Sequence, residues 1–313
     1  MTELSIGAFT VLFVLDWRNT VKRNFLVLYG IIYFFLAGLT YLVQQNFASA
    51  ELLNTYTLLD KAWTGYLALP LLLFTLLIIP YNLFMWIDKQ TGVDEKGYKK
   101  RTSPALVRTI RLIIGTLTVL AGLVTLFVMG MIFRPLAATS LAGVFTVASF
   151  FAAALAVGGV MTAMWLGHWY LVTPALSEKP YLFVTTLVLL GVLAEVIISF
   201  IAVPAPTTAT TSSASTPVIT SATPTTSASA ATPTPSSEVK PAGALVAAPL
   251  TTGVIGWLHI LVGFVIPLVI GGISWKLIRD RSFQSATGML YLVVVCALAG
   301  EAMARGLFLM GLQ

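Results

Sequence analysis

The sequence has few charged residues. Only 10% of its 313 residues are Asp, Glu, Lys or Arg, whereas 58% are hydrophobic and the mean hydropathy is +0.92. An ordinary soluble domain carries about 25% charged residues, so this composition excludes one and indicates a membrane protein. Most of the basic residues that give the net charge of +6 lie between apolar segments, where such residues indicate membrane orientation. Nucleic acid is therefore not an expected partner.

Cysteine and histidine are also scarce. The single cysteine, Cys296, excludes an intrachain disulfide and a cysteine-ligated iron–sulfur cluster. The two histidines, His168 and His259, both fall in or beside apolar runs. No metal site is expected from these residues, except that His259 or His168 would serve as an axial ligand if the chain bound haem b.

Long apolar runs dominate what is present. A helix that crosses a hydrocarbon core of about 30 Å needs roughly 20 apolar residues. Seven runs are long enough, and an eighth, 4–16, is short for a span. The sequence thus predicts an all-α fold, a polytopic transmembrane helical bundle of about eight spans. The seven long runs are 25–43, 63–87, 110–133, 138–173, 181–203, 253–275 and 286–310.

One segment of different composition divides these runs. Residues 204–244 are a Pro/Ser/Thr/Ala tract with almost no charge, which is typical of a disordered tether. We therefore expect a six-span bundle over 1–203, a disordered linker over 204–252, and a two-span hairpin over 253–313 packed on the bundle.

The placement of lysine and arginine predicts the orientation. If the run 4–16 spans, fourteen basic residues fall on one side and three, Lys61, Arg134 and Lys240, on the other, with Arg305 inside the membrane. Cytoplasmic loops retain positive charge. The expected location is the inner (cytoplasmic) membrane, with the linker and both termini outside.

Four ionisable residues fall at one predicted depth. Counted from the cytoplasmic ends of their runs, Glu195 and Glu301 each lie about 14 residues in, or roughly 21 Å. His259 is near the same level, and Arg305 follows Glu301 by one helical turn. Charged groups at such depth are costly unless paired or hydrated, and they usually face a bundle interior.

This layer has two interpretations. Glu301 and Arg305 would merely neutralise each other and lock the last helix, while Glu195 bonds Ser199 or another neighbour. Alternatively, Glu195, His259, Glu301 and Arg305 form a quinone and proton site, because quinol oxidation releases two protons that need acceptors. Glycines in the run 253–275, Gly263 among them, would permit close helix packing or a flat ring beside the backbone.

The second histidine lies in the aromatic segment "GHWYL". His168 and Trp169 are expected near the cytoplasmic boundary, either as an interfacial anchor or as a second quinone or proton site. The predicted depths of His168 and His259 differ by roughly 15 to 20 Å, which argues against one haem iron bound by both.

The terminal stretch "GEAMARGLFLM" carries a resemblance. Together with the eight-span plan, Gly300, Glu301, Arg305, Leu307 and Phe308 resemble the last helix of the membrane anchor of dimethyl sulfoxide reductase and polysulfide reductase type complexes. The resemblance implies a haem-free quinol-binding subunit that passes electrons to an iron–sulfur protein and a molybdenum catalytic subunit.

The expected function is therefore a membrane subunit of a multisubunit respiratory or photosynthetic electron-transfer complex, part of an oxidoreductase and not catalytic alone. Three alternatives stay open. They are a haem b subunit, a proton or solute transporter in which the same residues form a relay, and a purely structural accessory subunit.

Overall fold

The fold is that of a computed structural model, which describes residues 1–89, 92, 105–137, 140–174, 176–201 and 254–310. Within these residues every regular element is a helix and no strand forms. The predicted linker over 204–252 falls outside the described residues. The structure confirms the all-α polytopic bundle, because seven of its helical segments are long and apolar enough to cross a membrane.

The seven candidate spans agree with the seven long apolar runs. They are 23–47, 61–87, 106–136, 142–172, 179–200, 256–279 and 283–306. Large apolar side chains such as Phe35, Leu69 and Leu106 stay exposed on the outside of the bundle, as expected of surface that contacts lipid tails. The chain is thus a multi-pass membrane protein.

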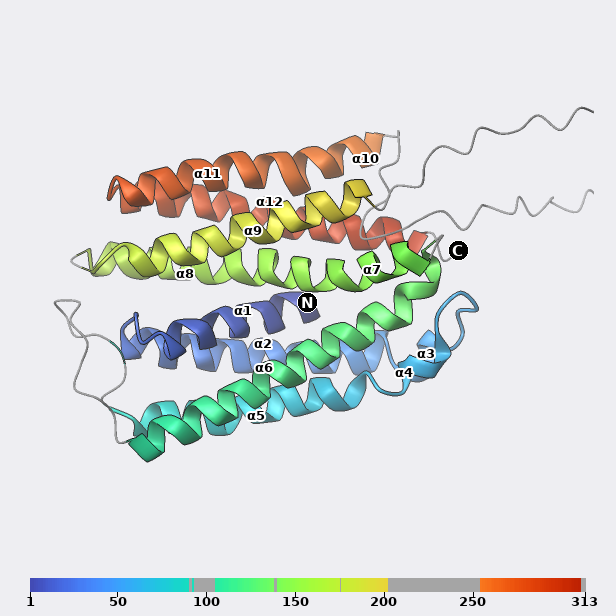
Figure 1. The fold of residues 1–313 in the computed structure, drawn as a ribbon, viewed down its shortest axis with the longest axis horizontal. Helices are drawn as coiled ribbons and strands as arrows, with labels where there is room; N and C mark the ends of the chain where they lie inside the picture. The colour runs from blue at the N-terminus through green and yellow to red at the C-terminus, as the bar shows by residue number, and fades with distance from the viewer. Residues whose placement is uncertain (90–91, 93–104, 138–139, 175, 202–253, 311–313) are drawn as a thin grey trace, which may run out of the picture.

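The helices run roughly along one axis (Figure 1). Five are uninterrupted over most of the bundle: α2 (Arg23–Phe47), α5 (Ala68–Ile87), α6 (Ala105–Phe133), α9 (Lys179–Ile201) and α12 (Phe283–Met310). Two further segments contain a π-helical turn each: α7 (Ser140–Ala153), η2 (Ala154–Gly158) and α8 (Gly159–Val172); and α10 (Val254–His259), η3 (Ile260–Val265) and α11 (Ile266–Arg279). The short elements are α3 (Ala50–Leu53), α4 (Lys61–Thr64) and η1 (Arg134–Leu136).

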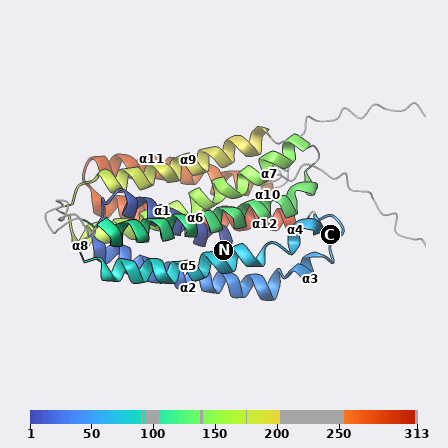
Figure 2. The same cartoon turned by 60° about the horizontal axis from the view of Figure 1, so that its bottom comes forward.

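The two ends of the bundle differ in their connections and in their basic residues. We call one of them the basic end; it holds the α1–α2, α8–α9 and α11–α12 connections together with Lys22, Lys179 and Arg281. The other, here the α3 end, holds α3, α4, η1 and the start of α10, as both views show (Figure 2). Which end faces outward, and on which side the termini lie, stay predictions from the positive charge.

Helix α1 (Thr2–Trp17) occupies the centre of the bundle. Its 16 residues extend about 24 Å at 1.5 Å per residue, less than the hydrocarbon core, and it is not among the seven candidate spans. It begins midway along the bundle and ends at the basic end (Figure 1). Ile6, Phe9 and Leu12 are fully buried, because α1 is surrounded by α2, α6, η2 and α8.

Glycine allows α1 to reach this central position. A Cβ atom on Gly7 would overlap the backbone of Ala154, and one on Gly158 would overlap the backbone of Gly7. Helix α1 and the π-turn η2 therefore touch backbone to backbone, as small residues permit between membrane helices. This contact fixes the height of the first turn of α1 in the bundle, and with it the position of Glu3.

Candidate functional site

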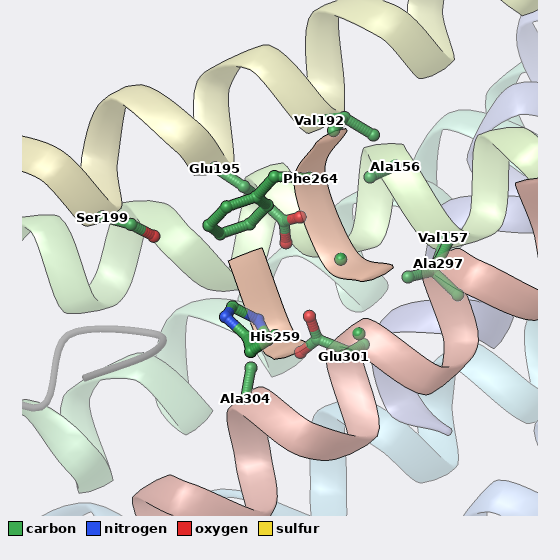
Figure 3. Close-up of a pocket in the computed structure, with 12 residues that line it drawn as sticks. Ala156, Val157, Val192, Glu195, Ser199, His259, Phe264, Ala297, Glu301 and Ala304 are labelled. Carbon is green, nitrogen blue, oxygen red and sulfur yellow. The ribbon is translucent and has the colours of Figure 1, made fainter. Parts of the chain in front are cut away.

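The structure brings together three of the four ionisable residues predicted to share a layer. Glu195 of α9, His259 at the end of α10 and Glu301 of α12 line one buried pocket (Figure 3). Arg305, one turn beyond Glu301, lies beside the pocket, with its Nε 2.5 Å from Glu301 Oε1. Residues predicted to share one depth therefore meet in space.

This buried pocket is small. Its volume is about 10 Å³, room for about one water molecule. Besides the ionisable groups it is lined by Ser199 and by small or apolar residues, which are Ala156, Val157, Val192, Gly263, Phe264, Ala297, Gly300 and Ala304. A quinone ring does not fit between Glu195, His259 and Glu301 in this structure.

Both π-helical turns border the pocket. Ala156 and Val157 belong to η2, whereas Gly263 and Phe264 belong to η3, which follows His259 directly. A π-turn inserts an extra residue into a helix and is found frequently at functional sites. On the η3 side, a Cβ on Gly300 would overlap the Cα of Gly263, so α12 and η3 are in backbone contact there. This contact bears out the close packing expected of Gly263.

Arg305 also contacts a residue that the sequence analysis did not select. Its Nη2 donates a hydrogen bond of 2.5 Å to Glu3 on α1, and its guanidinium lies 4.1 Å from the centre of the Phe150 ring. No role was predicted for Glu3 from the sequence. Its role depends on how deeply α1 enters the bundle, which no local pattern in the sequence reveals.

Glu3, Glu195 and Glu301, with Arg305, form what we term the carboxyl cluster. Glu3 and Glu301 pair with Arg305, and Glu195 lines the same pocket as Glu301. The side chains of Glu3 and Glu301 are only 7% and 15% exposed. Three carboxylates beside one guanidinium would be costly in a membrane, so bound protons would bring the cluster closer to neutrality.

A second, larger cavity is lined by two residues of the cluster, Glu3 and Arg305. This α3 cavity has a volume of about 350 Å³ and occupies the space beyond the first turn of α1, toward the α3 end. Its polar residues are Thr2, Glu3 and Arg305. The remaining lining is aromatic or apolar: Met1, Phe47, Ala48, Leu52, Leu53, Tyr56, Leu59, Met129, Phe133 and Phe150. Arg305 thus lines the α3 cavity and pairs with Glu301, which lines the buried pocket.

A second ionic network lies near the other end of α1. Arg111 of α6 is 1% exposed and pairs with Asp16 at 3.0 Å and with Asp88 at 2.6 Å. The Tyr81 hydroxyl donates a further bond of 2.9 Å to Asp16. Arg111 is one of the fourteen basic residues that the orientation pattern places on one side of the membrane. Its burial was not foreseen, because three separate helices supply this network.

The remaining predicted residues lie far from the cluster. His168 is exposed near the basic end of α8, and the neighbouring Trp169 packs edge-on against Phe25 at 5.9 Å. Since α10 begins at the α3 end, His168 and His259 lie toward opposite ends of the bundle and do not meet at one iron. Within the described ranges, no three His, Cys, Asp or Glu residues are grouped to hold a metal ion.

Comparisons with protein-family models, with curated proteins and with solved structures found no match for this chain.

Proposed function

We propose that this chain is the quinol-binding membrane subunit of an electron-transfer complex, with the quinol ring in the α3 cavity and the carboxyl cluster as acceptor of its protons. The observation that carries the proposal is a ring-sized apolar cavity that ends on Glu3 and Arg305, next to further carboxyl groups.

The size and lining of the α3 cavity suit an aromatic headgroup. Small-molecule sites typically measure about 300 to 1,000 Å³ and combine apolar walls with a few polar groups. The cavity falls at the lower end of this range, at about 350 Å³, with Phe47, Tyr56 and Phe133 in its walls. At its polar side, Glu3 would accept a hydrogen bond from a quinol hydroxyl, and Arg305 would donate one to a quinone carbonyl.

The charges of the cluster suit proton acceptance. A quinol that becomes a quinone loses two protons and two electrons. Glu3 at the cavity would take a proton directly, and Arg305 links this carboxylate to Glu301, beside Glu195. Because three carboxyl groups share one guanidinium, the cluster can hold extra protons and move toward neutrality. The electrons would pass to a partner protein, for which an iron–sulfur protein is the expected class.

Photoaffinity labelling tests the site directly. The chain, reconstituted in lipid nanodiscs, would be labelled with a short-chain azidoquinone and mapped by peptide mass spectrometry. We expect saturable labelling within residues 47–59 or 129–150, which excess unlabelled quinone prevents. Arg305→Gln should weaken this binding by about tenfold, as loss of one charge-assisted hydrogen bond implies. Arg134→Gln, an exposed arginine at the same end of the bundle, is the matched control.

Two outcomes would contradict the quinone site: labelling that unlabelled quinone does not reduce, or equal binding in the Arg305→Gln and Arg134→Gln variants. Membership of a complex needs its own experiment, which is purification of the chain from its native membrane under mild conditions. Recovery as a lone chain, without a redox partner, would argue against a subunit of an electron-transfer complex.

A proton transporter is the second candidate, and a specific observation favours it. Helix α1 has a carboxyl group paired with an arginine near each end, Glu3 with Arg305 and Asp16 with Arg111. Paired ionisable residues within membrane helices mark the proton relays of pumps and transporters. The internal pH of proteoliposomes, measured with an enclosed pH-sensitive dye, would then change when a membrane potential is imposed, without any quinone. Glu3→Gln would abolish this proton flux.

A further inference from the structure

Three buried polar atoms in the small pocket lack a hydrogen-bond partner among the described residues. They are Ser199 Oγ, His259 Nδ1 and Glu301 Oε1, which come from α9, α10 and α12. Ser199 and His259 are each 2% exposed. Glu301 Oε1 faces Arg305 Nε at 2.5 Å, but without the alignment of a hydrogen bond. Polar atoms buried this deeply are almost always hydrogen-bonded, to protein or to ordered water.

The pocket between these atoms has the size of one water molecule. Its volume of about 10 Å³ matches the space that a single buried water needs. Figure 3 shows the polar residues that line it: Glu195 and Ser199 both come from α9, His259 from α10 and Glu301 from α12. A bound water typically makes about three hydrogen bonds to otherwise unsatisfied groups, and this pocket supplies that number.

The backbone around the pocket keeps this space open. Small residues, Ala156, Gly263, Ala297, Gly300 and Ala304, form much of the wall. The π-turns η2 and η3 interrupt the regular helix on two sides of it. The space therefore results from residue size and helix geometry together.

We propose that one ordered water binds in this pocket, bridging Ser199 and His259 to Glu301, and that it connects His259 to the carboxyl cluster. Through it, protonated Glu301 gives a proton to the water, which passes one of its own to His259. Glu301 becomes a carboxylate, His259 an imidazolium, and the water is unchanged. The relay rests on the proposed function, since it extends the path of the quinol protons, whereas the water site itself does not.

Hydroxyl-radical footprinting by water radiolysis tests the water site without quinone or partners. Radicals form from ordered water at the site, so buried side chains beside one are oxidised quickly. In nanodiscs prepared in ¹⁸O-labelled water, we expect labelled oxygen on His259 and Phe264, which border the pocket. Phe74, a fully buried phenylalanine outside both cavities, should stay unmodified and serves as the internal control.

Variants that fill the pocket or remove a ligand sharpen the test. Ala304→Val places methyl groups in the pocket and should lower His259 oxidation at least fivefold, whereas Ala302→Val, exposed on the same helix, should leave it unchanged. If Ala304→Val does not fold, Ser199→Ala, which removes one water ligand, should lower the oxidation instead. His259 oxidation no faster than that of Phe74, or oxidation unaffected in a folded Ala304→Val chain, would overturn the proposal.

The outcomes of the footprinting experiment and of the quinone-labelling experiment distinguish the water site from the proposed function. A positive footprint with no saturable quinone binding leaves the water site intact and removes the proposed function. Saturable quinone binding with no footprint at His259 leaves the α3 cavity as a quinone site and removes the water relay.

Discussion

Arg305 of α12 lies 2.5 Å from the carboxylate of Glu3 on α1, although the two residues are 302 positions apart in the chain. The same guanidinium pairs with Glu301 on its own helix. Arg305 therefore joins the last helix to the first, and it lines the α3 cavity while pairing with a residue of the buried pocket. Position and charge together make it the central residue of the site.

Loss of the Arg305 guanidinium should destabilise the bundle. Arg305→Gln leaves Glu3 and Glu301 without their common partner in a buried site, for which a loss of about 3 kcal/mol is typical. Arg305→Lys keeps the charge but not the fork that reaches two carboxyl groups, so its loss should be smaller. Thermal unfolding in detergent measures both. A loss no larger than that of exposed Arg134→Gln would show that the pairs contribute nothing.

Gly300→Ala should destabilise the packing of α12 on η3. The added Cβ overlaps the Cα of Gly263, and overpacking of this kind costs about 1 to 3 kcal/mol. Gly288→Ala on the same helix is the matched control, since a Cβ there meets open space. It should be neutral or stabilising by up to about 1 kcal/mol, because alanine favours a helix more than glycine does. Equal melting temperatures for the two variants would contradict the close contact.

Removal of Arg111 should destabilise the basic end. Arg111→Gln leaves Asp16 and Asp88, both fully buried side chains, without their guanidinium, and a loss of about 3 to 5 kcal/mol is expected. Asp16→Asn added to Arg111→Gln should restore part of it, since one buried charge is then gone. A double-mutant cycle in thermal unfolding measures this coupling. Additive losses, or a loss as small as that of exposed Arg279→Gln, would contradict the network.

The ion pair at the basic end should show a pH dependence. Arg281 donates a 2.7 Å hydrogen bond to Glu178, which lowers the pKa of this carboxyl below its ordinary value of 4.5. The pair therefore stabilises the fold above pH 4.5, and this contribution disappears as the pH falls through the lowered pKa. Both side chains are partly exposed, so the effect is small.

Thermal unfolding between about pH 3 and pH 6, the range in which a glutamate ordinarily titrates, checks how the stability contributed by Glu178 depends on pH. The melting temperature of Glu178→Gln should be slightly lower than that of the unchanged chain at pH 6, and the two should converge at pH 3. A constant difference over this range would show that the Glu178 carboxylate does not contribute through its charge.

The sequence predicted the spans well because their signal is local. Each of the seven long apolar runs reaches the thickness of a bilayer, and each corresponds to a candidate span in the structure. That Glu195, His259 and Glu301 share a level along the bundle was predictable for the same reason, since a helix rises by a constant distance per residue. Counting residues along three helices placed these side chains at one level, and they share one pocket.

The lateral arrangement was not predictable in this way. Helices that are apolar on all sides give little indication of which face is turned inward. Glu3 and Arg111 were therefore not recognised, because their partners lie on other helices. The π-turns at 154–158 and 260–265 occur in plain apolar sequence, so nothing in the pattern marked them.

The sequence by itself thus determined a multi-pass helical membrane protein and the level of its buried charges, because span length and helical rise are properties of single segments. Only the tertiary structure decided that α1 enters the bundle partway, that Glu3 joins Arg305, and that a ring-sized cavity and a water-sized pocket form beside the carboxyl cluster. These features arise from contacts between helices, and the energy of such contacts depends on neighbours that the linear sequence does not identify.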